Sequence, residues 1–312
     1  MTRLLLTALF LLPLLGFAAD ADVEWFIDCA RGAQSNCTRQ VPCKSLQLAM
    51  SRTDRAVPTT IWIQAGAICV EHTIVVADAK RLTIAGRGGT AQLLFNGADT
   101  ALHVVSSTLR LRDVALGDAE TALATIGSNL DFANSTFHST GIAILAIAED
   151  VDAALHLRNV TITASRQPLR VQSYAVNSSL DVLISHCLFI DNSHAYAGHL
   201  IQLQSAAQRG ALVLEQSHFV RNGLDSPGAF ALLFIRWDGD AAIVDSSFSA
   251  NWVHVTTPDN INGGLIDASA ASLNLTRCVF AHNRISLHSK AAAVTGGLVT
   301  LSALRADVAQ NA

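Results

Sequence analysis

Apolar residues recur along this chain in one short pattern: an apolar residue, a second two positions later, and a third five positions after that. The seven copies are Leu109-Leu111-Leu116, Leu130-Phe132-Phe137, Leu155-Leu157-Ile162, Val182-Ile184-Phe189, Leu212-Leu214-Phe219, Ala241-Ile243-Phe248 and Leu273-Leu275-Phe280. Their third positions follow one another at steps of 21, 25, 27, 30, 29 and 32 residues. A fixed motif with spacers of variable length is typical of a solenoid, in which each repeat stacks on the preceding one.

The alternation within each copy, as in Leu155-His156-Leu157, predicts strands, because side chains two residues apart lie on the same face of a strand. Helical repeats would need apolar residues spaced by three and four positions, and no repeat sustains that spacing. Coils of this length accommodate three short strands with turns between them. The sequence therefore predicts an all-β fold, a parallel β-helix solenoid.

Three further columns align with the repeat. Small residues, expected to face inward, precede the third apolar position by two: Val114, Ser135, Val160, Cys187, Ser217, Ser246 and Cys278. Polar residues, expected at an outward corner, precede it by three: Asp113, Asn134, Asn159, His186, Gln216, Asp245 and Arg277. In the last four copies an asparagine follows it by three: Asn192, Asn222, Asn251 and Asn283. Asparagine tolerates left-handed backbone, so we expect these four residues to form tight corners and to bond one another along the stack.

Two motifs give the repeat a resemblance to a known family. Phe-x-x-Asn, as in Phe189–Asn192, is followed later by two glycines and two apolar residues, as in Gly263-Gly264-Leu265-Ile266. This combination resembles the repeat of the polymorphic outer-membrane protein family, within the pectate-lyase-like group of right-handed parallel β-helices. The resemblance spans residues 22–312 and implies an extracellular adhesin or surface protein, although the chain has no room for a C-terminal membrane barrel.

The resemblance also divides the chain. Trp25-Phe26-Ile27-Asp28 and a short helix ending at Met50 look like an N-terminal cap, expected at residues 22–55, with the β-helix at 56–312. Near the other end, Gly296-Gly297-Leu298-Val299 opens another coil, and no polar cap follows before Ala312. An uncapped solenoid exposes unpaired strand edges, so we expect a longer native product or self-association through this end.

The first 21 residues have the composition of a signal peptide. Arg3 precedes an apolar run from Leu4 to Ala18, and small residues then allow cleavage after Ala18 or Ala21. No second run is long enough to span a bilayer, so we expect a secreted protein without a transmembrane segment in its mature chain.

Six cysteines fit an oxidising compartment. Four lie in or near the cap and are expected to form two disulfides, with three pairings open: Cys29, Cys37, Cys43 and Cys69. Cys187 and Cys278 share the inward column but lie three coils apart, too far for a disulfide, so we expect buried thiols. Five sequons mark candidate N-glycosylation sites: Asn36, Asn134, Asn159, Asn177 and Asn274.

Catalysis is not favoured by the sequence. A polysaccharide lyase or hydrolase needs grouped carboxylates, whereas the aspartates are scattered over different repeat positions: Asp113, Asp131, Asp181, Asp191, Asp245 and Asp267. Four histidines within 33 residues also occupy different repeat positions: His186, His194, His199 and His218. We therefore expect no metal or other cofactor. The formal charge of −4 and the lack of a Lys/Arg run argue against nucleic acid as a partner.

Aromatic residues outside the repeat columns are the better candidates for ligand contact. Trp237 is expected in a turn at residues 236–240, while Tyr196 and Trp252 follow asparagine corners. Exposed rings at such places stack on sugars or anchor a protein partner. We expect a non-catalytic role in adhesion or in binding an extracellular glycan, matrix or surface protein. The alternatives are a polysaccharide lyase or glycoside hydrolase of the pectate-lyase-like group, and a structural segment of a larger surface protein.

Overall fold

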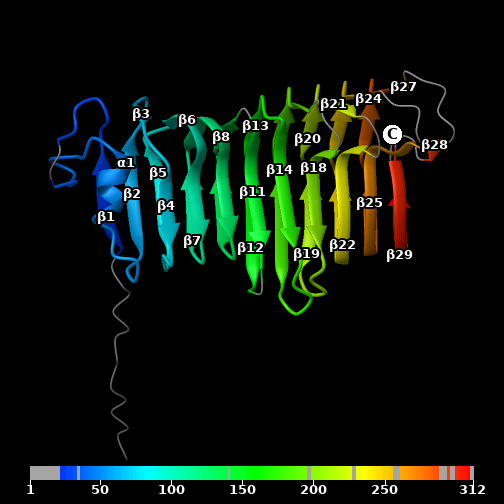
Figure 1. The fold of residues 1–312 in the computed structure, drawn as a ribbon, viewed down its shortest axis with the longest axis horizontal. Coiled ribbons are helices and arrows are strands. Elements are labelled where there is room, and N and C mark those ends of the chain that lie inside the picture. The colour runs from blue at the N-terminus through cyan, green and yellow to red at the C-terminus, as the bar shows by residue number, and fades with distance from the viewer. Residues whose placement is uncertain are drawn as a thin grey trace, which may run out of the picture.

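Coils of β-structure stack along one axis, from the N-terminal coil at the left of Figure 1 to the last strands at the right. The computed structural model describes residues 22–33, 36–139, 141–149, 151–194, 198–226, 230–255, 261–287, 294–295 and 299–309. The predicted signal peptide lies outside these residues. Within the described ranges, parallel pairing joins 25 strands into one continuous sheet, and four short strands form a second sheet. The protein is therefore the right-handed parallel β-helix that the repeat and the resemblance predict.

Each coil contributes strands to three long faces. The anchor face holds the first two apolar positions of each repeat and contains β1 (Val23–Ile27), β2 (Thr59–Gln64), β5 (Leu82–Arg87), β7 (Thr108–Arg112), β9 (Asn129–Ala133), β12 (Ala153–Arg158), β15 (Leu180–Ser185) and β19 (Ala211–Glu215). The ladder face holds the third position and contains β3 (Ile68–Val70), β10 (Thr136–His138), β13 (Thr161–Thr163), β16 (Leu188–Ile190), β20 (His218–Val220), β23 (Ser247–Ser249) and β26 (Val279–Ala281). The lateral face contains β4 (Ile74–Ala77), β11 (Ile142–Ala148), β14 (Gln167–Ser173) and β18 (Gly198–Ser205).

Long strands bend from one face to the next. Those that join the ladder and lateral faces are β6 (Ala91–Val105) and β8 (Val114–Ile126). Those that join the lateral and anchor faces are β22 (Phe230–Val244), β25 (Ile261–Thr276) and β29 (Val299–Ala309). The second, short sheet lies between the ladder and lateral faces and contains β17 (Ser193–His194), β21 (Gly223–Ser226), β24 (Trp252–Val255) and β27 (Arg284–Leu287). A further strand, β28 (Val294–Thr295), pairs with β25.

The strand register confirms the predicted repeat. Leu155 pairs with Leu130 on one side and with Val182 on the other, so the first apolar positions form one column. Stacking begins earlier than predicted, because β1 pairs with β2 along its whole length although it falls in the expected cap. The hydrogen-bonded stack therefore extends into residues 22–55.

The third column forms an internal ladder of aromatic rings in the last coils. Phe219 stacks on Phe189 with ring centroids 4.8 Å apart and on Phe248 at 4.5 Å. Phe248 in turn stacks on Phe280 at 5.1 Å. Because the coil spacing of a parallel sheet is about 4.8 Å, one ring per coil gives a continuous stack.

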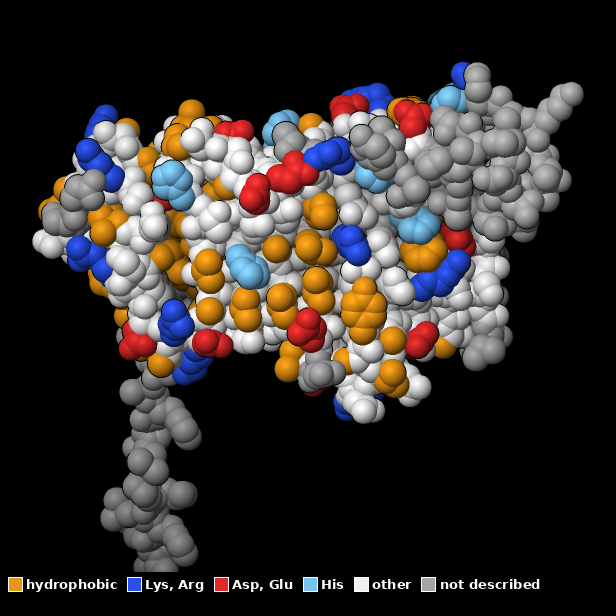
Figure 2. Space-filling view, in the orientation of Figure 1, with side chains coloured by type: hydrophobic (Ala, Val, Ile, Leu, Met, Phe, Trp, Pro, Cys, Tyr) orange, Lys and Arg blue, Asp and Glu red, His pale blue; other side chains and the backbone are white. Residues whose placement is uncertain are grey.

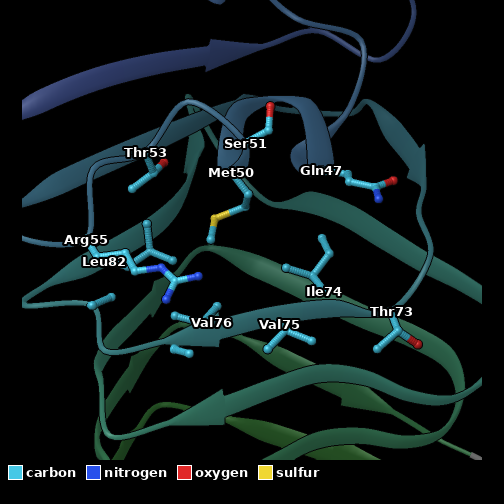
Figure 3. A pocket seen from close by; sticks show the side chains of 12 residues that line it. Gln47, Met50, Ser51, Thr53, Arg55, Thr73, Ile74, Val75, Val76 and Leu82 are labelled. Carbon is cyan, nitrogen blue, oxygen red and sulfur yellow. The ribbon is translucent and has the colours of Figure 1, made fainter.

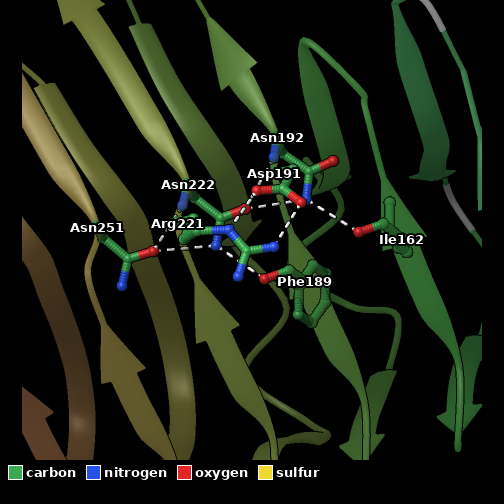
Figure 4. A network of polar contacts seen from close by, with 7 residues as sticks. All are labelled: Ile162, Phe189, Asp191, Asn192, Arg221, Asn222 and Asn251. Carbon is green, nitrogen blue, oxygen red and sulfur yellow. Dashed lines mark hydrogen bonds and ion pairs between the residues drawn. The ribbon is translucent and has the colours of Figure 1, made fainter.

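The asparagine column forms a second internal ladder, drawn in Figure 4. The Nδ2 of Asn192 donates to Oδ1 of Asn222 at 3.0 Å, and the pattern repeats from Asn222 to Asn251 and from Asn251 to Asn283. Each amide also donates to a carbonyl on the ladder face of the preceding coil, as Asn222 does to Phe189 at 2.8 Å. Asparagine is therefore required at this position, because its side chain has a donor, Nδ2, and an acceptor, Oδ1, that bond different neighbours.

The left-handed residues lie one position earlier than predicted for this corner. Positive φ occurs at the residue before each asparagine, as at Asp191 (φ 55°) and Arg221 (φ 52°). The prediction that the asparagines themselves turn the corner is thus wrong, because their side chains must point inward to form the ladder. The polar column that precedes the third apolar position by three was also predicted to form a corner, and this prediction is confirmed. Every member of that column has positive φ: Asp113, Asn134, Asn159, His186, Gln216, Asp245 and Arg277.

Two disulfides close the N-terminal region, as predicted. Cys29 bonds Cys69, and Cys37 bonds Cys43. The short helix α1 (Leu46–Met50) begins at Ser45, whose Oγ accepts a hydrogen bond from Leu48 N at 3.2 Å. Within the described ranges, no helix is both long enough and apolar enough to cross a bilayer.

The two remaining cysteines are buried thiols in the inward column, as predicted. Burial raises the pKa of Cys187 to about 11, with backbone hydrogen bonds at Val160 and Ser185 opposing the shift. Burial also raises the pKa of Cys278. Because the reactive form of cysteine is the thiolate, both thiols are core residues and poor nucleophiles.

Candidate functional site

Two rows of outward side chains run along the lateral face, and both change character at β14. The first row contains Val75, His103, Ala124, Leu145, Arg170, Gln202, Phe234 and Asp267. The second row contains Ala77, Val105, Ile126, Ile147, Gln172, Gln204, Arg236 and Ser269. In Figure 2, hydrophobic side chains gather over the earlier strands of this face, and charged and histidine side chains gather over the later ones. Apart from His103, this face of the solenoid is thus apolar toward the N-terminus and polar toward the C-terminus.

Four side chains of the polar half pack into one group, called here the lateral cluster: His199, Phe234, Arg236 and Asp267. The imidazole of His199 stacks on the Phe234 ring with centroids 3.8 Å apart, and the Arg236 guanidinium lies 4.5 Å from the same ring centroid. Arg236 also donates two hydrogen bonds of 3.1 Å to the two oxygens of Asp267. Phe234 therefore orders the imidazole and the guanidinium, and Asp267 neutralises the guanidinium.

The imidazole of His199 is uncharged near neutral pH. Burial lowers the pKa of His199 to about 4, with Asp267 opposing and Arg236 reinforcing that change. Its Nδ1 is buried and has no hydrogen-bond partner within the described part of the chain. A neutral imidazole with a spare nitrogen can donate or accept one hydrogen bond, depending on its tautomer.

Trp252, one of the predicted contact residues, forms a platform on the short sheet. It pairs with Gly223 of the preceding coil, and a Cβ at Gly223 would overlap the indole ring. The indole thus lies flat on the glycine backbone, and Trp252 remains 37% exposed. His254 and Asp225 lie on the same two strands, with Nδ1 and Oδ1 3.1 Å apart. The arrangement offers an aromatic surface flanked by hydrogen-bonding groups.

The other two predicted aromatic contacts are not part of this platform. Trp237 is only 2% exposed and belongs to the core, so its prediction as a surface contact is wrong. The expected turn at 236–240 is a register shift within β22, and Leu233, Ile235 and Trp237 alternate inward along it. That alternation also places Phe234 and Arg236 outward, which is the sequence signal for these two members of the lateral cluster. Tyr196 lies outside the described residues.

Most of the aspartates considered as catalytic candidates are engaged by arginines of neighbouring coils. Asp131 accepts from Arg158 at 2.5 Å, and Arg221 donates to Asp191 at 2.7 Å. Asp245 pairs with Arg277, and Asp267 with Arg236. Asp181 instead accepts from the Ala211 amide. These carboxylates bridge adjacent coils rather than converging in one groove.

The four histidines considered as metal ligands are also dispersed. His186 lies at a corner next to Ser185, while His218 lies on the ladder face beside Ser247. The described residues bring three potential ligands together at one place, Cys29, Cys69 and Glu71. Both cysteines there belong to a disulfide, so the group has no thiolate to offer a metal.

All five sequon asparagines are exposed. Asn134 and Asn159 occupy neighbouring coils, and Nδ2 of Asn159 donates to Oδ1 of Asn134 at 2.9 Å. Exposure is a requirement for glycan attachment, and glycosylation of these residues stays a prediction.

A pocket of about 360 Å³ lies between α1 and β4, as Figure 3 shows. Its apolar lining includes Met50, Ile74 and Leu82. The guanidinium of Arg55 extends into it and lies 3.9 Å from Asp78. Among the described residues that line this pocket there is no carboxylate, histidine or cysteine, so it lacks an acid–base pair for catalysis.

Comparison with known proteins gives fold similarity only. No protein-family model matches the chain. No curated protein matches its sequence. Among solved structures, an alginate lyase from Paenibacillus is 13% identical with a TM-score of 0.44, over 82% of this chain and 96% of that one.

Two further structures share the same kind of likeness. The GH136 lacto-N-biosidase from Eubacterium ramulus is 10% identical with a TM-score of 0.41, over 90% of this chain and 68% of that one. The surface protein and adhesin PfbA from Streptococcus pneumoniae is 8% identical with a TM-score of 0.20, over 81% and 92% of the two chains. At these values the similarity concerns the fold, which hosts unrelated activities.

Proposed function

We propose that this is a secreted, non-catalytic protein that binds a glycan in adhesion or matrix attachment. The observation that carries the proposal is the indole of Trp252, which lies flat on Gly223 while Trp252 remains 37% exposed. The C–H faces of a sugar ring pack on such a surface, and the nearby Asp225 and His254 supply hydrogen bonds to hydroxyls. The two disulfides and the predicted signal peptide support secretion.

The state of the carboxylates favours binding over hydrolysis. Glycosidases use two carboxyl groups that flank the scissile bond. Here Asp131, Asp191 and Asp245 each pair with an arginine of the next coil. A paired carboxylate is held ionised and is a poor general acid, as the lowered pKa values of Asp191 and Asp245 illustrate.

Glycan-array binding of the mature chain, residues 22–312, tests the proposal. We expect Trp252→Ala to abolish binding, because it removes the stacking surface, and Gly223→Ala to weaken it, because the new Cβ displaces the indole. Tyr174→Ala is the matched control, since Tyr174 is an exposed aromatic residue elsewhere, 64% exposed. Binding by Trp252→Ala that equals the wild type would refute the platform.

A polysaccharide-cleaving enzyme is the second candidate function, and the lateral cluster favours it. His199 is an uncharged imidazole near neutral pH and has a lone pair to accept a proton from a bound substrate, although a pKa of about 4 makes it a weak base. Incubation with a panel of polysaccharides, followed by measurement of new reducing or unsaturated ends, decides between the two. Release of chain ends that is lost in His199→Gln would establish the enzyme, and no release by the wild type would leave binding as the function.

A further inference from the structure

Arg170 is the one arginine of the two lateral rows that no carboxylate engages within the described ranges. It projects from the middle of β14, half-buried, between Leu145 of the preceding coil and Gln202 of the following one. Its Nε is buried and has no hydrogen-bond partner among the described residues. Nε itself is closed to solvent, but the side chain is half-exposed and no described carboxylate pairs with it, so the guanidinium is suited to receive an anion from outside the protein.

The surroundings of Arg170 leave its charge uncompensated. The other arginine of the rows, Arg236, is neutralised by two hydrogen bonds to Asp267. His199 is uncharged near neutral pH, because burial lowers its pKa to about 4. The polar half of the lateral face therefore has a local positive charge, although the whole chain has a formal charge of −4.

Uncharged hydrogen-bonding groups lie next to Arg170 along the rows. Gln202 pairs with Arg170 in the first row, and its Nε2 donates to Gln204 at 3.2 Å. Gln172 follows on the same strand as Arg170 and is 5% exposed. A guanidinium with neighbouring amides recognises a carboxylate or sulfate, and arginine does so with two parallel hydrogen bonds.

We infer that Arg170 and Gln202 bind the anionic group of an acidic polysaccharide that runs along the lateral face, so that the protein selects acidic over neutral glycans. The inference rests on the proposed glycan-binding function and adds a substrate class and a second contact surface. Coils repeat about every 4.8 Å along this face, so an extended chain meets an outward side chain of a new coil at each such interval. The apolar rows before β14, including Leu145 and Ile147, offer a flat surface to the C–H faces of its sugar rings.

Calorimetric titration with three polymers tests this inference: polygalacturonate, a sulfated carrageenan and a neutral glucan. We expect the wild type to bind the two acidic polymers more tightly than the neutral glucan. The tighter of the two acidic polymers shows whether the site prefers a carboxylate or a sulfate. Arg170→Ala is expected to weaken acidic binding about tenfold or more, the effect of losing one charge-assisted contact. Arg170→Lys is expected to recover part of the affinity, because it keeps the charge but loses the two-pronged geometry.

The controls separate this inference from the proposed function. Arg112→Ala removes an exposed arginine of the anchor face and should leave every affinity unchanged. Trp252→Ala tests the platform alone. If Trp252→Ala loses all binding while Arg170→Ala keeps the wild-type preference for acidic polymers, only the lateral site is overturned. Wild-type protein that binds the neutral glucan as tightly as polygalacturonate, or that binds neither acidic polymer, would overturn the inference. Circular dichroism spectra of each variant verify that the β-helix is intact.

Discussion

Asn222 donates a hydrogen bond from Nδ2 to Oδ1 of Asn251 at 3.1 Å, and both side chains are fully buried. The same Oδ1 of Asn251 accepts from the backbone amide of Asn222 at 2.9 Å. Each asparagine therefore satisfies both a side chain and a main-chain group of the neighbouring coil. A corner that would otherwise leave backbone groups without partners is closed by one residue per coil.

Asn222→Ala should destabilise the protein by about 2–4 kcal/mol, since several buried groups lose a partner at once. The Phe189 carbonyl loses its donor, and Asn192 loses the acceptor for both its Nδ2 and its backbone amide. Urea unfolding followed by circular dichroism measures the change. Asn274→Ala, in unglycosylated protein, is the control, because Asn274 is exposed on a strand; an equal loss in both variants would contradict the ladder's role.

Phe219→Ala should cost about 3–5 kcal/mol, the usual range for a buried phenylalanine. The ring is fully buried and stacks on both neighbours, so its removal interrupts the aromatic ladder and leaves a cavity. Denaturant melts give the value. A loss below about 1 kcal/mol would mean that the column does not pack as described.

Glu71 should make the stability of the cap depend on pH. Burial raises the pKa of this carboxyl above its ordinary 4.5, with hydrogen bonds from the amides of Leu46 and Gln47 opposing the change. A raised pKa means that folding favours the protonated form, so this group's contribution is complete below pH 4.5 and is lost as the pH rises through the folded pKa.

The test is the unfolding free energy of the wild type and of Glu71→Gln, measured from about pH 4 to about pH 7. The wild type should lose stability relative to the variant as the pH rises, because glutamine does not ionise. A difference that stays constant with pH would show that Glu71 titrates normally.

His199 should titrate near pH 4 in a ¹H–¹⁵N NMR titration of the folded protein, because burial lowers its pKa to about that value. The lowered pKa stabilises the fold above the unfolded value of 6.5, and this contribution is lost as the pH falls toward 4. Phe234→Ala should raise the pKa of His199 by admitting water to the stacked ring, and Phe234→Leu should raise it less. Unchanged titration in Phe234→Ala would mean that the stacking does not bury the imidazole.

Asn134 and Asn159 should not both be glycosylated on one molecule expressed through a eukaryotic secretory pathway. Their side-chain amides are 2.9 Å apart on neighbouring coils, so a glycan on one occupies the space of the other. Mass spectrometry of peptides spanning both sites reports the occupancy. Doubly modified peptide as the main species would contradict this expectation.

The sequence was sufficient for the scaffold because the scaffold repeats. The offset between Leu155 and Ile162 recurs in every copy, and the coil register preserves it strand by strand. The sequence predicted the left-handed corner one residue too late. Asparagine tolerates positive φ, but here its side chain bonds both neighbouring coils from the position after the corner. At Asp191 the turn needs only an outward side chain, whereas Asn192 must reach both neighbouring coils.

The lateral cluster was not predicted because its members come from three strands joined by spacers of unequal length. His199, Phe234 and Asp267 meet only through the pairing of β18, β22 and β25, which the repeat motif does not fix. Trp237 was misplaced for a local reason: the following Asp-Gly-Asp sequence indicates a turn, but the strand continues through it with a shift in register. The packing of the Trp252 indole depends on Gly223, 29 positions earlier, and this contact arises only once the coils are stacked.

The two ladders make whole coils interchangeable as building blocks. Removal of residues 220–248 would join Phe219 to Ser249 and recreate Phe-x-x-Asn with Asn251, so the rings and amides would again form unbroken columns. The same excision would remove Phe234 and Arg236 from the surface. Removal or insertion of one whole coil would therefore change the length and the binding surface of the protein while both internal ladders stay continuous.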